Sequence, residues 1–357
     1  MSCEVIFVSR SLSLSGSTTW MNTLIKVFQQ MGIPCRHIVV GRQKKIESTA
    51  HECFYTEQPR RLIKFKIMRL FQVHKLFKKF FSKKEDDFYN EQIARYFKNT
   101  DTPALVIKDF SAYLPSFFQS ANYKVIAVLH HQHTYLEQNS YYDHLVAVSQ
   151  GIMDNSRKLG YQVEKVIYNP VNSKEICDKS TAYTVDESNY IIYVGRLHQE
   201  KGVYELIQAY YELLKEGVLE KKLVFVGEGK AKEKLEAYVK DREIQEQVVF
   251  KGFLKNPYPY IKKASLLVLP SYSEAMGYVA IEAGVLNTSY LVSDYPAAQE
   301  FFPETNIFIK GETQEQFIKS LKNKIIDLLD NPQVQLKNNI VDVMKPEIIA
   351  EQYMEFM

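Results

Sequence analysis

The chain has 357 residues and a formal net charge of +3, with 46% hydrophobic and 24% charged residues. This composition is ordinary for a folded globular protein, so it excludes intrinsic disorder as the main state. The small net charge also excludes a polyelectrolyte, and any basic surface must arise from local clustering. Because the chain is longer than one hydrophobic core usually organises, we expect two domains.

Four cysteines occur, and none forms a C-x-x-C pair. Their spacing indicates neither a zinc site nor a disulfide framework, which favours a reducing cytoplasm. The first residues lack the basic and apolar regions of a signal peptide, and no apolar run is long enough to cross a bilayer. We therefore expect a cytoplasmic protein that can meet a membrane only from the side, at the inner face of the plasma membrane.

Short apolar runs alternate with amphipathic stretches through the first half of the chain. After the first loop, apolar residues recur at helical spacing from Trp20 to Met31, with Ser17 or Thr18 as the expected helix cap. The strands expected in this half are Val5–Val8, Ile38–Val40, Ala104–Ile107, Val125–Leu129, Leu145–Val148 and Val166–Tyr168.

The same alternation resumes after Asn169-Pro170 and a polar stretch from Asn172 to Asn189. The expected strands are Tyr190–Val194, Leu223–Val226, Val248–Phe250, Leu266–Leu269 and Tyr290–Val292, with helices at Val203–Lys215 and Lys230–Lys240. Buried strands that alternate with helices indicate parallel, doubly wound sheets. We therefore expect an α/β protein with two Rossmann-like domains, residues 1–172 and 173–345, which face each other across a cleft.

Residues 60–84 form a long segment without any acidic residue. Its apolar residues fall near one helical face, and basic residues supply the rest, among them Arg61, Lys64, Arg69, Lys75, Lys78 and Lys79. A basic amphipathic helix of this kind can lie in an anionic membrane interface, and we favour that interpretation over a solvated helix packed on its own domain. Nucleic-acid binding is the third alternative, but no recognisable binding module accompanies the segment.

Two cations follow the strand expected at Tyr190–Val194. In YIIYVGRLHQEKG, Arg196 and Lys201 lie in the turn that enters the next helix. An Arg fork and a Lys point charge at the carboxyl end of a strand suit a diphosphate. Such a pair can stabilise a negatively charged leaving group, a role that a metal often has in other enzymes. The alternative is that these residues are only solvated loop cations.

Two acidic residues follow the strand expected at Leu266–Leu269. In LVLPSYSEAMGYVAIEAG, a short loop with Glu274 and Gly277 leads into a helix that contains Glu282. The backbone amides near Met276, Gly277 and Tyr278 would lie at a helix N-terminus, which is a natural phosphate site. A capped helix with two surface acids is the alternative, and the cations in the same half of the chain argue against it.

These motifs resemble glycosyltransferase family four, the glycosyl transferases group 1, whose members are retaining enzymes with the two-domain GT-B fold. The stretches that carry the resemblance are YVGRL…KGVYELIQAY, LVFVGEGKAKEKLEAYV, VVFKGFL and the E-x7-E segment from Glu274 to Glu282. They run in the family's order and cover most of residues 190–300. The first half is similar only in outline, at the Gly16 loop, VLHHQH, LVAVSQGIMDN and VIYNPV.

The resemblance implies a donor-binding C-terminal domain and an acceptor-binding N-terminal domain. The last helix, within residues 346–357, would cross back to the N-terminal domain, as it often does in the family. Gly16 would let the backbone approach the donor, and His130 would lie near the reacting sugar. In the donor site, the resemblance implies that Arg196 and Lys201 bind the diphosphate, and that the amides of Met276, Gly277 and Tyr278 contact its phosphates. Glu274 would bind the donor sugar, and Glu282 would bind the ribose. Gly252, Leu254 and the rest of GFLKN would contact the base.

The histidine cluster leaves two alternatives open. His130, His131 and His133 are crowded, so either His130 or His131 can be the active-site histidine. An H-H-x-H metal site is a further alternative, but the cluster has no cysteine or carboxylate partner nearby and no D-x-D motif stands elsewhere. We therefore expect a metal-independent enzyme. The sequence departs from the family at Met276, which is more often aromatic, and in the run after Glu282.

The activity that the resemblance implies is retaining transfer of a hexose or N-acetylhexosamine from a nucleotide-diphosphate sugar, with UDP as the expected nucleotide. The expected acceptor is a glycan, a lipid-linked sugar or a bacterial surface polymer. A nucleotide-sugar epimerase of the GT-B type and a non-catalytic sugar-nucleotide-binding partner of a transferase remain as alternatives. Front-face attack fits retention, because no carboxylate of the motifs is an evident nucleophile.

Overall fold

The computed structural model describes residues 4–9, 16–40, 53–56, 86–97, 103–110, 112–131 and 141–357, and of residues 16–18 it describes the backbone alone. The chain forms two compact units. The N-terminal unit comprises Met1–Val148, Met153–Pro170 and Pro346–Met357, and the C-terminal unit comprises Ser149–Ile152 and Val171–Lys345.

The described part of the N-terminal unit contains a parallel sheet in the order β3-β2-β1-β4-β5-β6-β7. Its strands are β1 (Glu4–Ser9), β2 (Cys35–Val39), β3 (Cys53–Tyr55), β4 (Ala104–Asp109), β5 (Tyr123–Leu129), β6 (His144–Ala147) and β7 (Lys165–Val166). The helical segments among the described residues up to Pro170 are α1 (Gly16–Gln30), residues 86–96, η1 (Ser116–Gln119) and α4 (Gln150–Lys158).

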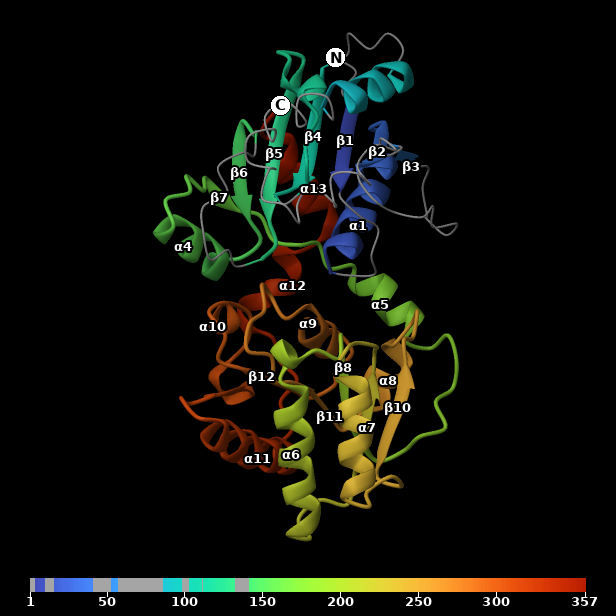
Figure 1. The fold of residues 1–357 in the computed structure, drawn as a ribbon, viewed down its shortest axis with the longest axis vertical. Helices are drawn as coiled ribbons and strands as arrows, with labels where there is room; N and C mark the ends of the chain where they lie inside the picture. The colour runs from blue at the N-terminus through green and yellow to red at the C-terminus, as the bar shows by residue number, and fades with distance from the viewer. Residues whose placement is uncertain are drawn as a thin grey trace, which may run out of the picture. The chain divides into compact units, whose positions relative to one another are not determined.

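Helices cover both faces of this sheet. On one face, Phe7 of β1 packs edge-on against Trp20 of α1. The helix α13 (Pro346–Met354) contacts α1, so the last helix of the chain lies in the unit formed by the first strands (Figure 1). On the other face, Ile93 of the 86–96 helix lies in the core with residues of β1, β2, β4 and β5. The cap expected at Ser17 or Thr18 is wrong, because α1 begins at Gly16 and both residues lie inside it.

The C-terminal unit contains a second parallel sheet, in the order β10-β9-β8-β11-β12-β13. Its strands are β8 (Tyr190–Val194), β9 (Lys222–Val226), β10 (Val248–Gly252), β11 (Leu266–Leu269), β12 (Tyr290–Ser293) and β13 (Ile307–Phe308). The bounds predicted for β8 and β11 are confirmed. Both strands lie at the centre of the sheet, where burial on two faces requires continuous apolar runs.

The C-terminal unit is helical between its strands and after the last of them. Its helical segments are α5 (Ser173–Lys179), η2 (Gln199–Lys201), α6 (Val203–Lys215), α7 (Lys232–Asp241), α8 (Tyr258–Lys263), α9 (Tyr278–Val285), α10 (Ala298–Phe301), η3 (Glu304–Asn306), α11 (Gln314–Asp330), η4 (Lys337–Asn339) and α12 (Ile340–Val343). The polar stretch at 172–189 is therefore not a plain linker, because it contains α5. Asn172 caps this helix by accepting a hydrogen bond from the amide of Glu175 at 3.0 Å.

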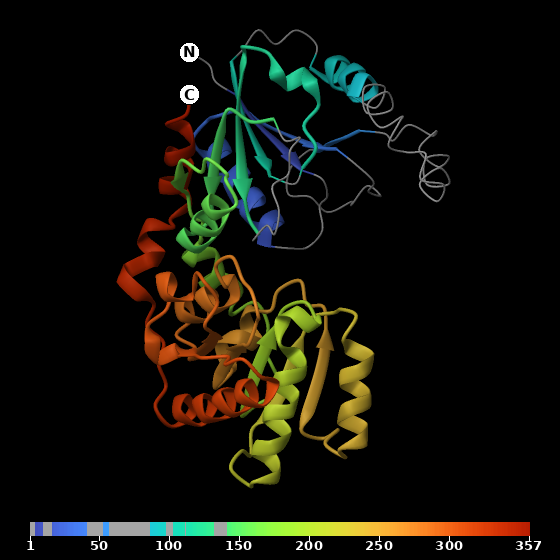
Figure 2. The ribbon, with the colours of Figure 1, turned by 60° about the vertical axis from the view of Figure 1, so that its left-hand side comes forward.

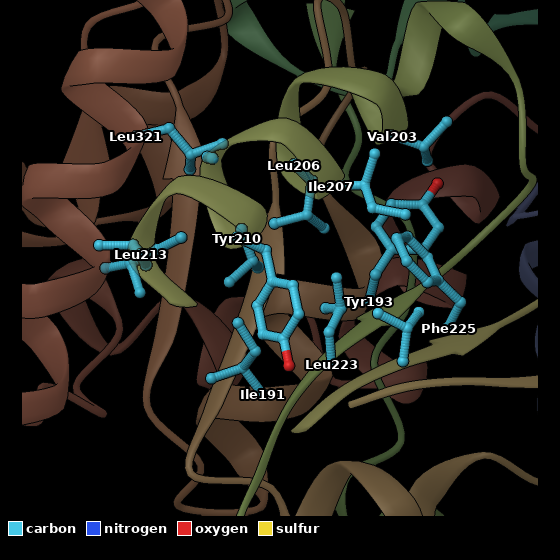
Figure 3. Close-up of a cluster of buried hydrophobic side chains, with 14 of the residues drawn as sticks. Ile191, Tyr193, Val203, Leu206, Ile207, Tyr210, Leu213, Leu223, Phe225 and Leu321 are labelled. Carbon is cyan, nitrogen blue, oxygen red and sulfur yellow. The ribbon is translucent and has the colours of Figure 1, made fainter. Parts of the chain in front are cut away.

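One core cluster joins α6, α7 and α11 to a single face of this sheet. Figure 3 shows Tyr210 of α6 beside Ile191 and Leu223 of the strands, and Leu213 belongs to the same cluster. In Figure 2, α6 and α7 both lie beside the strands of this unit. On the opposite face α9 contacts β11 and β12, so the sheet is covered on both sides.

Both units therefore have the doubly wound Rossmann-like topology, with β1 or β8 as the central first strand and the chain reversing direction next to it. The expected α/β fold class with two parallel sheets is confirmed. Among the described helices, none combines the length and the apolar character that a membrane crossing requires.

Candidate functional site

The C-terminal sheet changes its winding direction between β8 and β11. These two strands are neighbours. The chain continues from β8 to β9 towards one edge of the sheet, and from β11 to β12 towards the other edge. Loops at such a switch point form the usual ligand site of an open α/β sheet. The two loops are joined directly, because the amide of Tyr272 donates a hydrogen bond to the carbonyl of Glu200 at 3.0 Å.

An ion pair connects the same two loops. Lys201, the last residue of η2, donates from Nζ to Oε1 of Glu274 at 2.6 Å. The Ser271 hydroxyl donates to the same carboxylate oxygen at 2.7 Å. The side chains of Lys201 and Glu274 are only 15% and 19% exposed, so water and salt screen their attraction less than that of a surface pair.

Gly202 lets the two loops approach each other. Its φ of +66° lies in the left-handed region, and an added Cβ would lie 2.0 Å from the carbonyl oxygen of Pro270. A side chain at this position would therefore push the β8–α6 connection away from the β11–α9 connection. The glycine that follows Lys201 in the sequence thus fixes where Lys201 meets Glu274.

Arg196 forms a different pair. Its guanidinium donates to Oε1 of Glu200 at 3.0 Å, and the two side chains are 56% and 57% exposed. Pairs this exposed contribute little to stability and exchange partners readily. The structure thus brings Lys201 and Glu274 together, whereas Arg196 forms an exposed ion pair with Glu200 in the connection that also contains Lys201.

The β11–α9 loop ends at the N-terminus of α9. Gly277 has a φ of +74°, and an added Cβ would lie 2.1 Å from the hydroxyl oxygen of Tyr295. That hydroxyl donates to the carbonyl of Met276 at 3.1 Å, while the Met276 side chain is buried. The helix begins at Tyr278, and the first amides of an α-helix have no partner within the helix. This end of α9 can therefore bind an anion.

Glu282 lies one turn further along α9 and is half-buried. The Tyr258 hydroxyl donates to its Oε1 at 2.9 Å. Burial raises the pKa of Glu282 to about 7, and the Tyr258 hydrogen bond and the charge of Lys179 oppose this rise. Because the folded-state pKa lies above the ordinary value, the ionised carboxylate lowers stability as the pH rises towards 7. A carboxylate that is costly to ionise in this position is typical of a functional site.

Gly252 and Leu254 lie at the end of β10. The Gly252 carbonyl accepts a hydrogen bond from the amide of Gly227 at 2.8 Å, which ties the β10 end to the loop after β9. Leu254 is half-buried and follows Phe253, an aromatic side chain that is exposed. In the sheet order, this edge lies two strands away from β8.

The N-terminal unit holds the other predicted site residues. Gly16 is the first residue of α1, and His130 directly follows β5. His130 is buried with its ring 4.5 Å from that of Trp20, centroid to centroid. Burial lowers the pKa of His130 to about 4, although the charge of Asp109 opposes this effect. His130 is therefore neutral near pH 7 and can take part in hydrogen bonds only as a neutral imidazole.

Several other predicted residues lie outside the described ranges. His131 is exposed, but His133 lies outside the described residues, so the metal alternative for this cluster stays untested. The same holds for the whole basic segment of residues 60–84, including Arg61, Lys64, Arg69, Lys75, Lys78 and Lys79. Within the described ranges, no group of three or more histidine, cysteine or acidic side chains is placed to hold a metal ion.

Three residues of the site were not predicted. Ser271 and Tyr272 are part of the motif that carries Glu274, and their spacing from it could have indicated a contact. Tyr258 is separated from Glu282 by 24 positions, and no periodic pattern connects them. Only the packing of α5 against both α8 and α9 brings such residues together.

Known proteins resemble the chain in both sequence and fold. Residues 178–342 match the family model of the glycosyl transferases group 1. The N-acetylgalactosamine-N,N'-diacetylbacillosaminyl-diphospho-undecaprenol 4-alpha-N-acetylgalactosaminyltransferase of Campylobacter jejuni is 28% identical over 46% of this chain and 44% of its own length. The O-antigen chain mannosyltransferase RfbU of Salmonella typhimurium is 27% identical over 50% of each chain. The chain thus spans about half the length of the curated relatives it matches.

The similarity in fold, unlike the similarity in sequence, covers nearly the whole chain. The pneumococcal O-GlcNAc transferase GtfA, solved in complex with UDP and GlcNAc, has a TM-score of 0.69 and is 12% identical over 99% of this chain and 98% of its own. The GT-B fold class is therefore confirmed. In sequence, the similarity to the glycosyl transferases group 1 lies in residues 178–342.

Proposed function

We propose that this protein is a retaining glycosyltransferase that moves a hexose or N-acetylhexosamine from a nucleoside-diphosphate sugar, with UDP as the nucleotide, to a glycan or lipid-linked acceptor. The observation that carries the proposal is the Lys201–Glu274 pair at the switch point of the C-terminal sheet. A cation and a carboxylate at one strand edge suit the two parts of the donor, its diphosphate and its sugar hydroxyls. The N-terminus of α9 adds amides for the phosphates.

The paired residues suggest how the donor is bound. The diphosphate would compete with Glu274 for the ammonium group of Lys201, and the freed carboxylate would accept hydrogen bonds from the sugar hydroxyls. Arg196, whose pair with Glu200 is exposed, can turn to the diphosphate at little cost. Glu282 would bind the ribose, and the stretch from Gly252 to Leu254 would contact the base.

The reaction then follows from the charges. The bond between the anomeric carbon and the diphosphate oxygen breaks, and its electron pair leaves with the diphosphate. The acceptor oxygen bonds to the anomeric carbon from the same face, and its proton passes to a phosphate oxygen of the leaving group. Lys201 and Arg196 stabilise the negative charge that develops on the diphosphate. His130, as a neutral imidazole, can hydrogen-bond the sugar. These cations make a metal ion unnecessary, so we propose metal-independent transfer.

The relatives suggest the class of acceptor. The Campylobacter protein is named for an acceptor that carries diphospho-undecaprenol, and the Salmonella protein for O-antigen chains. The GtfA structure contains UDP and GlcNAc. We therefore propose a role in bacterial polysaccharide or glycoconjugate synthesis, with UDP-N-acetylhexosamines and UDP-hexoses as the first donors to examine.

A binding screen followed by a transfer assay tests the function. A sugar nucleotide that binds the folded protein raises its melting temperature by mass action. The selected donor is then incubated with lipid-linked and free glycan acceptors, with and without EDTA. We expect transfer in both cases, and the product should keep the anomeric configuration of the donor. Free epimerised sugar without an acceptor product would indicate the epimerase alternative. Loss of transfer in EDTA would contradict metal independence.

The basic segment supports a peripheral position at the inner face of the plasma membrane, which we include in the proposal. We expect the full-length protein to co-sediment with liposomes that contain anionic phosphatidylglycerol. Each basic side chain near such a surface contributes about 1 kcal/mol. Changing Lys75, Lys78 and Lys79 together to Glu should therefore reduce this binding by at least a hundredfold, on the order of the three lost contributions.

The matched control changes three exposed lysines of the C-terminal unit, Lys230, Lys234 and Lys240, to Glu. This variant has the same net charge as the test variant but keeps the basic segment. If both variants bind anionic liposomes equally well, the segment is not the membrane contact.

A further inference from the structure

Tyr258 is the first residue of α8, and its hydroxyl is directed at the ribose-binding candidate Glu282 of α9. The O–H donates to Oε1 at 2.9 Å, and the described residues give this carboxylate no other hydrogen bond. Burial raises the pKa of the Tyr258 phenol as well, so the hydroxyl keeps its proton at neutral pH. Tyr258 is therefore a permanent donor to one oxygen of Glu282.

A single hydrogen bond to one oxygen orients the whole carboxylate. A glutamate side chain loses considerable rotamer freedom when it is fixed, and that entropy must otherwise be lost when a ligand binds. The Tyr258 bond fixes the position in advance and directs the remaining acceptor sites towards a ligand. Two vicinal hydroxyls are the donors that match the two oxygens of a carboxylate.

We propose that Tyr258 is a positioning residue that holds the Glu282 carboxylate, in its ionised form, for the two ribose hydroxyls of the nucleotide. This inference rests on the proposed function, because Glu282 has a ribose to bind only if the C-terminal unit binds a nucleotide. It adds that Tyr258, on the neighbouring helix α8, sets the preference of the site for a ribonucleotide. The same residue sets how this preference depends on pH.

The groups around Glu282 define the expected pH dependence. Helix α5 packs on α9 and brings Lys179, whose charge favours the ionised carboxylate and which is itself bonded to Glu175 at 2.5 Å. Strands β11 and β12, which also pack on α9, contribute no charged side chain. On α9 itself, burial raises the pKa of the Tyr278 phenol, and the nearby charge of Glu282 raises it further.

The direction of the pH effect follows from these contacts. Burial raises the pKa of Glu282 to about 7, and the Tyr258 hydrogen bond lowers it from an even higher value. Removing that hydroxyl should therefore move the pKa further up. If the ionised carboxylate binds the ribose, the affinity should fall as the pH decreases through this pKa, and the midpoint should lie higher without Tyr258.

The experiment measures the dissociation constants of UDP and 2′,3′-dideoxy-UDP by calorimetry between about pH 6 and about pH 9. The wild-type protein is compared with Tyr258→Phe and with Tyr260→Phe, a control in the same helix whose hydroxyl interacts with Glu187 and Lys251 instead. We expect the wild type to prefer UDP by roughly tenfold or more, as the loss of hydrogen bonds to a charged group implies. Tyr258→Phe should lose about three- to tenfold of this preference and shift the midpoint upwards, and Tyr260→Phe should do neither.

The outcomes separate the two claims. A wild-type protein that binds no nucleoside diphosphate contradicts the proposed function and the inference with it. A wild type that binds and prefers UDP, with an unchanged preference and midpoint in Tyr258→Phe, overturns the inference alone. Should Tyr258→Phe fail to fold, Glu282→Gln is decisive, because it removes the titrating group. UDP affinity that still varies with pH in that variant, as in the wild type, overturns the inference.

Discussion

Lys201→Ala is expected to reduce the rate of sugar transfer on the order of a hundredfold or more, with the fold intact. The ammonium group is the most shielded cation of the candidate donor site, and its partner Glu274 lies 2.6 Å away. Removing it withdraws the charge that stabilises the departing diphosphate. Among the described residues, it leaves the half-buried Glu274 carboxylate with the Ser271 hydrogen bond alone. Turnover with the selected donor and acceptor, together with circular dichroism, measures both effects.

The control for this prediction is Lys234→Ala, because Lys234 is an exposed lysine on α7. We expect it to behave like the wild type. Glu274→Ala should also abolish transfer, since it removes the proposed sugar-binding carboxylate from the same pair. Near-normal turnover in both Lys201→Ala and Glu274→Ala would refute the assignment of the site.

Gly202→Ala is expected to cause a large loss of stability in the C-terminal unit. The left-handed backbone alone costs an alanine about 1–2 kcal/mol. Here the new methyl carbon would also lie 2.0 Å from the Pro270 carbonyl oxygen, so one of the two loops must move. We expect a total loss on the order of 3 kcal/mol or more, together with loss of nucleotide binding. Urea unfolding and calorimetry provide the two measurements.

Gly217→Ala is the matched control. Gly217 has nearly the same φ, +68°, but an added Cβ would meet nothing within 4 Å. The difference between the two variants therefore isolates the contact with Pro270 from the cost of the backbone conformation. Equal losses in both variants would show that the close approach of the two loops is unimportant.

The central strands could be predicted from the sequence because burial on two faces leaves a continuous apolar run. This applies to Tyr190–Val194 and Leu266–Leu269, whose bounds agree with β8 and β11. Strand β13 was missed because it has two residues at a sheet edge, too few for any periodic pattern. Helix α5 was missed because its residues are mostly polar and only one of them, Ile176, is buried.

The candidate site could be predicted only in part. The sequence places Arg196, Lys201 and Glu274 in loops that follow two of the expected strands, and Glu282 in the helix after the second loop, because that placement depends on local order alone. The sequence does not show that Lys201 pairs with Glu274, or that Tyr258 reaches Glu282. Those contacts depend on loop geometry and on the packing of α5 against both α8 and α9. Short-range patterns contain no information about such distances.

The placement of α13 has a consequence for biosynthesis. Tyr353 is fully buried near Trp20, and Lys165 of β7 forms an ion pair with Glu355 at 2.6 Å, within a unit whose strands are all encoded before Pro170. On the ribosome, the whole of Val171–Lys345 must be synthesised before Pro346–Met357 can emerge and pack on α1. Because domains generally fold as their residues emerge, the half of the protein that is translated first becomes complete last. Until then it exposes an apolar surface to which a chaperone can bind.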